Sequence, residues 1–143
     1  MALPAQIAKR LRLPLIAAPM LRVSGPDLVV AACINGVIGA FPVANSRTLE
    51  QLDEWPVRIK SRLEAARAEE PSRIVAPFCP NLIIRHAQVR EALACLVRHK
   101  VEMVITSVGS PEVAVGAAPR HRLHDLRRRC HVASRRESDR DRS

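Results

Sequence analysis

The fold of this chain is decided by the stretch Leu13-Pro14-Leu15-Ile16-Ala17-Ala18-Pro19-Met20. A short apolar run bounded by prolines predicts a buried strand over residues 15–17. The following Ser24-Gly25-Pro26-Asp27 predicts the start of a helix, with Ser24 or Gly25 near the N-cap and Pro26 in the first turn. Because α/β folds bind ligands at the carboxyl ends of their strands, the first candidate site residues are Ala18, Pro19 and Met20.

Strand and helix patterns then alternate along the chain. A helix over 27–35 stops at Asn35-Gly36, and a second strand over 37–41 ends at Pro42. Further strands are predicted over 74–76 with 82–84, and over 101–106. This alternation predicts an α/β fold with a parallel sheet and right-handed crossovers. Spacing alone leaves open whether the strands form an open sheet or half of a barrel.

Two longer helices carry apolar residues at helical spacing. One, over 47–69, is capped by Ser46, and its interior Pro56 predicts a kink or a break near Trp55. Its apolar stripe consists of Leu49, Leu52, Ile59, Leu63 and Ala66. The other helix, over 88–100, is expected to face the core with Val89, Leu93, Leu96 and Val97.

Length and composition limit the architecture. The 143 residues are enough for one domain, but a (β/α)8 barrel typically needs roughly 250. Apolar residues make up 48% of the chain, yet only Phe41, Trp55 and Phe78 are aromatic. The core must therefore consist mainly of Ala, Val, Leu and Ile, as expected where parallel strands are buried on both faces.

Positive charge is concentrated near the end of the chain. The formal net charge is +9. Residues 1–118 hold 14 basic and 10 acidic residues, whereas residues 119–143 hold 9 basic and 4 acidic residues. The body is thus only mildly basic. A nucleic-acid-binding surface across the whole domain is not indicated.

Cysteine and histidine patterns do not point to a metal site. Cys33, Cys79, Cys95 and Cys130 lack metal-ligand spacing and predict buried free thiols. His86 and His99 are expected to be surface residues, on the side away from catalysis. The chain lacks a secretory signal and a membrane-spanning apolar stretch, which predicts a cytoplasmic protein.

Residues 13–45, with Asn81 and Thr106-Ser107-Val108-Gly109, resemble the nitronate monooxygenase (2-nitropropane dioxygenase-like) family of FMN-dependent TIM barrels. The resemblance covers residues 10–113 and implies that residues 1–113 are the first half of a TIM (β/α)8 barrel, a truncated FMN-binding domain. It implies that Ala18, Pro19 and Met20 lie along the flavin ring and that Asn81 hydrogen-bonds it. Ser107 would lie near the substrate. The implied reaction is oxidation of alkyl nitronates by dioxygen.

Each of these positions also has a purely structural interpretation. Met20 could be a core methionine at a strand end, and Asn81 could be a turn residue after a proline. Residues 106–109 could form an ordinary polar loop. Gly39 in the second strand could leave room for a ligand or for close packing.

Two parts of the family's site have no counterpart here. The family's general base is a histidine in a later Gly-rich motif, and the FMN phosphate is held by loops after the last strands. We therefore assign no catalytic residue, expect this chain to bind FMN poorly, and predict no measurable nitronate oxidation. An unclosed barrel would also expose strand edges through which the chain could self-associate.

The Arg-rich residues 114–143 do not continue the βα pattern and are expected to be disordered or weakly helical. Arg outnumbers Lys 20 to 3, as in a GC-rich gene, and the segment reads as out-of-frame translation. The alternative is a genuine basic tail on a small α/β module that binds nucleic acid or an acidic partner. DNA sequence beyond the codon for Val113 distinguishes the two.

Overall fold

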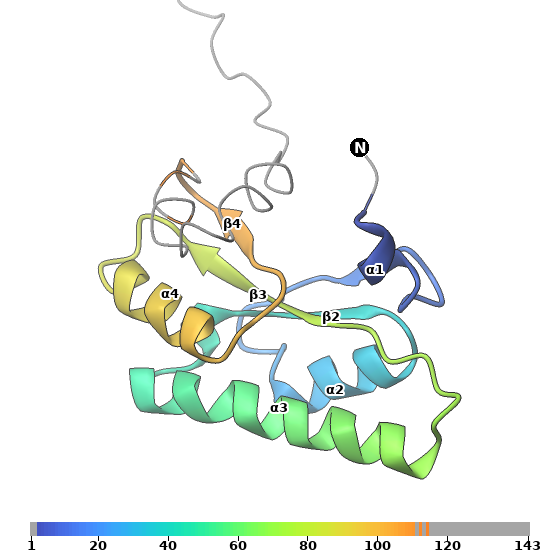
Figure 1. Cartoon of the computed structure of the whole chain (residues 1–143). Coiled ribbons are helices and arrows are strands. Elements are labelled where there is room, and N and C mark those ends of the chain that lie inside the picture. The colour runs from blue at the N-terminus through green and yellow to red at the C-terminus, as the bar shows by residue number, and fades with distance from the viewer. Residues whose placement is uncertain (1–2, 111, 113, 115–143) are drawn as a thin grey trace, which may run out of the picture.

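The computed structural model describes residues 3–110, 112 and 114, which form a four-stranded sheet with helices packed against it (Figure 1). The strand order is β1-β2-β3-β4, and all three pairings are parallel. The strands are β1 (Ile16–Ala17), β2 (Ile38–Pro42), β3 (Phe78–Ile83) and β4 (Ile105–Ser107). The helices are α1 (Ala5–Ala8), α2 (Pro26–Ile34), η1 (Val43–Asn45), α3 (Leu49–Glu69) and α4 (Val89–Arg98). The predicted α/β class and parallel βα order are confirmed, and the sheet curls as a half-barrel does.

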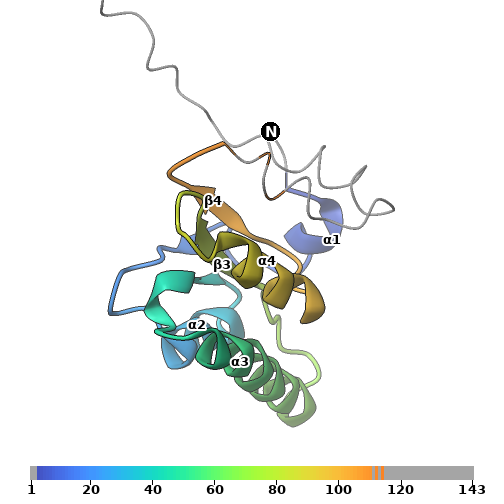
Figure 2. The same cartoon turned by 90° about the vertical axis from the view of Figure 1, so that its left-hand side faces the viewer.

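The two faces of the sheet pack differently because neighbouring residues of a strand point to opposite faces. Phe41 and Leu82 point to the side of α2, α3 and α4, where they form the main core. Figure 2 shows α2 and α3 lying together on this side of the strands. Ile38 and Cys79 point to the opposite face, where Ile7 of α1 packs against them.

Gly39 allows β2 to lie close to α2. A Cβ at this position would be 2.5 Å from the carbonyl oxygen of Val29 and 3.0 Å from Sγ of Cys33. A Cβ at position 39 would therefore fit only if the helix were displaced. Of the two interpretations of this glycine, helix–strand packing is therefore the one that the structure supports.

Of the kink or break predicted near Trp55, the break is wrong, because α3 continues through Pro56. Pro56 is fully buried, and the neighbouring Trp55 contacts Phe41 edge-on with ring centroids 5.2 Å apart. This packing helps to offset the roughly 3 kcal/mol that an interior proline costs a helix. The predicted apolar stripe is largely confirmed, since α3 buries Leu52, Ile59, Leu63 and Ala66.

The cap of α3 also differs from the prediction. Thr48, rather than Ser46, is the N-cap, and its hydroxyl accepts a hydrogen bond from the Gln51 backbone N–H at 3.1 Å. The Gln51 side-chain oxygen accepts in return from the Arg47 N–H at 2.8 Å. This reciprocal arrangement resembles a capping box and fixes where the helix begins.

The third strand is continuous, whereas two segments over 74–76 and 82–84 were predicted. Pro80 lies within it, although proline is normally excluded from central strands. The pairing with β4 begins at Asn81, so at Pro80 only β2 flanks the strand. A missing N–H is tolerated there because the strand is locally an edge.

Three further details were predicted wrongly. The strand over 15–17 was expected to be buried, but Leu15 and Ile16 are 55% and 45% exposed, because β1 is an open edge of the described sheet. β4 begins at Ile105 instead of residue 101. Val97 is 38% exposed, because Ala92 and Cys95 complete the buried face of α4 together with Val89, Leu93 and Leu96.

Cys33, Cys79 and Cys95 are buried free thiols, as predicted, whereas Cys130 lies outside the described residues. None of the helices that the structure describes combines the length and apolar character needed to cross a bilayer. The predictions for residues 115–143 also fall outside the described part of the chain.

Candidate functional site at the carboxyl edge of the sheet

The parallel strands bring the predicted site residues to one edge. Ala18, Pro19 and Met20 directly follow β1, while Asn81 lies in β3 and Ser107 ends β4. The carboxyl ends of parallel strands meet at the same edge of a sheet, which is where α/β folds bind ligands. All five residues are partly or largely exposed, and Met20 is 44% exposed. Met20 is therefore not a core methionine, and the purely structural interpretation of this residue is wrong.

The corner after β1 is held by Ser24. Its side chain is nearly inaccessible, with 1% of the residue exposed. The hydroxyl oxygen accepts a hydrogen bond from the Met20 N–H at 2.9 Å, and the hydroxyl donates to the Ala18 carbonyl at 3.3 Å. The N-cap of α2 is Gly25, without a side-chain cap bond, so Ser24 fixes the corner instead of capping the helix.

Asn45 joins the loops after β1 and β2. Its side-chain amide donates to the carbonyl oxygens of Met20 at 3.0 Å and Ser24 at 2.8 Å. Its side-chain oxygen accepts from the Arg22 N–H at 2.8 Å. Asn45 was not among the site residues predicted from the sequence. The pattern that could have indicated it is an asparagine three residues after Pro42, which ends the second strand.

Asn81 and Ser107 are in direct contact across neighbouring strands. The Ser107 hydroxyl donates to Oδ1 of Asn81 at 3.0 Å. In the register of the ladder, Asn81 pairs with Ile105 and Ile83 pairs with Ser107, so both polar residues share one face. Within the described residues, Nδ2 of Asn81 has no hydrogen-bond acceptor and remains available as a donor.

His86 lies at this edge too, which corrects the prediction that it is on the side away from catalysis. It is exposed, as predicted, in the loop between β3 and α4. Its Nδ1 accepts a hydrogen bond from the Gln88 N–H at 3.2 Å. His86 is therefore held by a contact within its own loop. Among the described residues, no acidic or nucleophilic side chain hydrogen-bonds to it.

His99 lies at the other end of the molecule and is not a surface residue. Its side chain is 17% exposed, and Nε2 is 2.6 Å from Oδ1 of Asp53. The same carboxylate accepts from Arg98 Nη2 at 2.5 Å, and the Cys95 thiol lies 3.6 Å away. Hydrogen bonds from Arg98 and His99 lower the pKa of Asp53 to about 2.

The Asp53, Cys95 and His99 ligand atoms lie within 4.8 Å of one another, a spacing that could hold a metal ion. However, Arg98 already supplies the positive charge beside the carboxylate. Burial also raises the pKa of the Cys95 thiol, which disfavours the thiolate that a metal needs. The group is best described as a polar link between α3 and α4.

Burial likewise raises the pKa of Cys33, to about 11. This thiol lies between α2 and β2 and donates to the Pro77 carbonyl at 3.4 Å. Neither cysteine is therefore an activated nucleophile at neutral pH.

The candidate residues at the carboxyl edge offer uncharged groups that could lie against a planar ring. Small residues at 17 and 18 leave room for a planar ring, Met20 offers a polarizable side chain, and Asn81 offers an amide donor. Two described glycines lie at this edge, and Gly25, the N-cap of α2, has open space where a Cβ would be. Gly109 does not form a phosphate cradle. A Cβ there would lie 2.9 Å from side-chain carbons of Ile84, so its backbone packs against the protein.

We found no protein family whose sequence pattern matches this chain, and no curated protein matches it either. The family resemblance therefore depends on the motifs at residues 13–45, 81 and 106–109.

Proposed function

We propose that this chain carries the flavin-ring side of an FMN-dependent oxidoreductase of the nitronate monooxygenase type. The observation that supports the proposal is the convergence of Ala18, Pro19, Met20, Asn81 and Ser107 at the carboxyl edge of one parallel sheet. The order and parallel pairing of the strands are compatible with the first half of a TIM barrel.

In this proposal each residue has a positioning role. The side chain of Met20 contacts one face of the ring, and Nδ2 of Asn81 donates to its polar edge. Ser107 holds the Asn81 amide in the orientation that presents Nδ2, because its hydroxyl occupies Oδ1. Bound FMN would supply the electron acceptor for the nitronate, with dioxygen completing the oxidation.

The same proposal predicts no turnover by the chain itself. A general base is missing from the described carboxyl edge, apart from the locally bonded His86. The loops that hold the FMN phosphate in the family also have no counterpart among the described residues, although Arg22, Arg47 and Arg85 are exposed in the loops at this edge. We expect purified protein to oxidise alkyl nitronates no faster than a blank containing FMN alone.

Flavin titration tests the proposal. We expect riboflavin and FMN to bind at the carboxyl edge with dissociation constants within about twofold of each other, because the proposed contacts there are made by the ring and none by the phosphate. Asn81→Ala should weaken both by about tenfold through the loss of one hydrogen-bond donor to the ring. Asn35→Ala is the matched control, since Asn35 donates to the Ala31 carbonyl at the end of α2, away from this edge.

Two results would contradict the proposal. One is the absence of riboflavin binding at millimolar concentration. The other is binding that Asn81→Ala and Asn35→Ala leave equally unchanged.

The alternative function, binding of nucleic acid or an acidic partner by a basic tail, depends on residues 119–143. These residues lie outside the described part of the chain. No observation on the described residues favours that alternative.

A further inference from the structure

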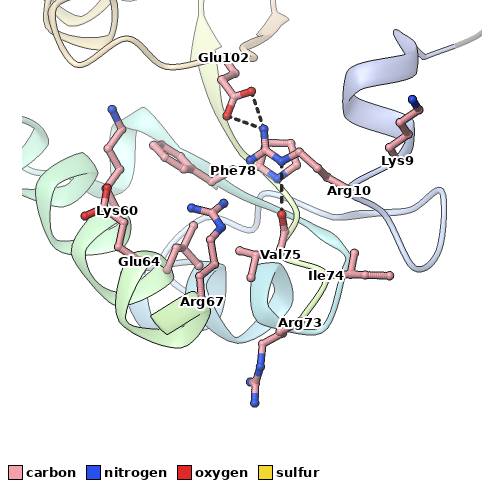
Figure 3. Close-up of a pocket in the computed structure, with 12 residues that line it drawn as sticks. Lys9, Arg10, Lys60, Glu64, Arg67, Arg73, Ile74, Val75, Phe78 and Glu102 are labelled. Carbon is pink, nitrogen blue, oxygen red and sulfur yellow. Dashed lines mark hydrogen bonds and ion pairs between the residues drawn. The ribbon is translucent and has the colours of Figure 1, made fainter. Parts of the chain in front are cut away.

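A hollow of about 630 Å³ lies at the amino edge of the sheet, opposite the carboxyl edge (Figure 3). Its walls are the chain after α1, the second half of α3, the segment leading into β3, and Glu102 before β4. The volume is in the range of small-molecule sites, about 300–1,000 Å³. None of the residues proposed to contact flavin lines it.

Charge is unbalanced in this hollow. Five basic residues line it and only two acidic ones, Glu64 and Glu102. The basic residues are Lys9, Arg10, Lys60, Arg67 and Arg73. This local excess was not visible in the sequence, where the body of the chain is only mildly basic.

Several of these charges are already engaged. Arg10 forms an ion pair with Glu102, with N–O distances of 2.7 and 2.9 Å, and its Nε donates to the Val75 carbonyl at 3.4 Å. Lys60 donates to the backbone carbonyl of His99. Arg73 pairs with Glu70 at 2.7 Å.

Arg67 differs from Arg10, Lys60 and Arg73, and it shares with Lys9 the lack of a described side-chain partner. Within the described residues it has no ion pair or hydrogen bond, and Figure 3 shows its guanidinium directed into the space beneath Arg10. The positive charges of Arg10 and Arg67 both oppose the rise in the pKa of the Cys33 thiol that burial causes. A planar guanidinium without a partner is suited to bidentate binding of a phosphate.

The floor of the hollow is apolar. Ile74 is 45% exposed, whereas Val75 and Phe78, which also line the hollow, are buried. Charged donors above an apolar floor match an organic anion better than an inorganic one, because the apolar portion of such a ligand would cover Ile74.

We infer that the amino-edge hollow binds a small phosphorylated organic molecule, with its phosphate on Arg67 and Arg10 and its apolar portion on Ile74. Glu64, three residues before Arg67 on α3, repels such a ligand and limits its affinity. The inference makes no use of the flavin proposal, and either can fail without the other.

Calorimetric titration of the full-length chain with adenosine 5′-monophosphate at low ionic strength tests the inference, with inorganic phosphate as the second probe. We expect the nucleotide to bind more tightly than inorganic phosphate. Arg67→Ala should weaken nucleotide binding by about tenfold, as the loss of a charge-assisted hydrogen bond predicts. Glu64→Gln should strengthen it by about two- to threefold through removal of the repulsive charge.

Arg58→Ala is the matched control, because Arg58 lies on the same helix but pairs with Asp27 outside the hollow. Binding to the Arg-rich tail would be insensitive to both Arg67→Ala and Glu64→Gln. That result, or the absence of nucleotide binding, would overturn the inference. Arg67-dependent binding of a single-stranded oligonucleotide without binding of the mononucleotide would overturn it in favour of a nucleic-acid site.

Arg67 is exposed in the last turn of α3, and alanine is a good helix former. Arg67→Ala should therefore fold normally. An unchanged circular-dichroism melting curve would establish that any loss of binding is local.

Discussion

At the carboxyl edge of the sheet, the residues proposed to contact flavin offer uncharged groups, and hydrogen bonds of Ser24 and Asn45 fix the corner after β1. Exposed cationic side chains also lie in the loops at this edge, namely Arg22, Arg47 and Arg85. At the amino edge, the lining residues are charged, and Arg67 has no described partner. The first arrangement is suited to the edge of an uncharged ring, and the second to an anion. Both edges depend on the same hydrophobic core. A substitution can therefore test one edge independently of the other only if it leaves the core intact.

The largest expected effect comes from breaking that shared core. Phe41 is fully buried between the sheet and the helices and contacts Trp55. Phe41→Ala should cost about 3–5 kcal/mol, a large part of the roughly 5–15 kcal/mol typical of a domain. Urea unfolding measures this loss of unfolding free energy. Val57→Ala is the control, because Val57 is 55% exposed and its substitution should change the unfolding free energy little.

Ser24→Ala should damage the carboxyl edge alone. It removes a nearly inaccessible hydroxyl and leaves the Met20 N–H without its partner. We expect a loss of about 1–3 kcal/mol in unfolding free energy, together with weaker riboflavin binding. Nucleotide binding at the amino edge should stay unchanged, and a parallel loss there would show that the two edges are not independent.

The open ends of the sheet should support self-association. Within the described residues, β1 pairs only with β2, and β4 pairs only with β3. Leu15, Ile16 and Val108 beside these edges are 55%, 45% and 60% exposed. We expect concentration-dependent sedimentation, weakened about tenfold or more by Ile16→Lys, because an edge lysine opposes strand addition. A monomer at all concentrations would contradict this prediction.

The smallest expected effect concerns Asp53 and depends on pH. Its folded-state pKa, about 2, lies below the ordinary value of 3.8, so its contribution to stability is present above pH 3.8 and lost as pH falls toward 2. Asp53→Asn should therefore melt at a slightly lower temperature at neutral pH. The difference in melting temperature between Asp53→Asn and the unmodified chain should disappear near pH 2. A difference that stays constant with pH would show that the Asp53 charge is not its cause.

The sequence was sufficient for the order and type of the main elements, because each βα unit carries its own hydrophobic period and its own stop signal. It failed where tertiary packing overrides local preference. Pro56 does not end α3 because it is buried beside Trp55, and Pro80 is tolerated where β4 has not yet begun to pair.

For the candidate site, a motif could indicate residues that follow a strand, such as Met20. It could not indicate Asn45, whose role depends on two loops meeting in space. The basic hollow was also invisible, since its lining residues are spread from position 9 to position 102.

The central claim is that the corner after β1 contacts the flavin ring. The chain has three methionines, and the structure describes Met20 at the carboxyl edge and Met103 packed beside Ile38 and Cys79. With isotope-labelled methionine methyl groups, riboflavin should shift the Met20 resonance by its ring current and leave Met103 nearly unmoved. An unmoved Met20 resonance at saturating riboflavin would contradict the claim.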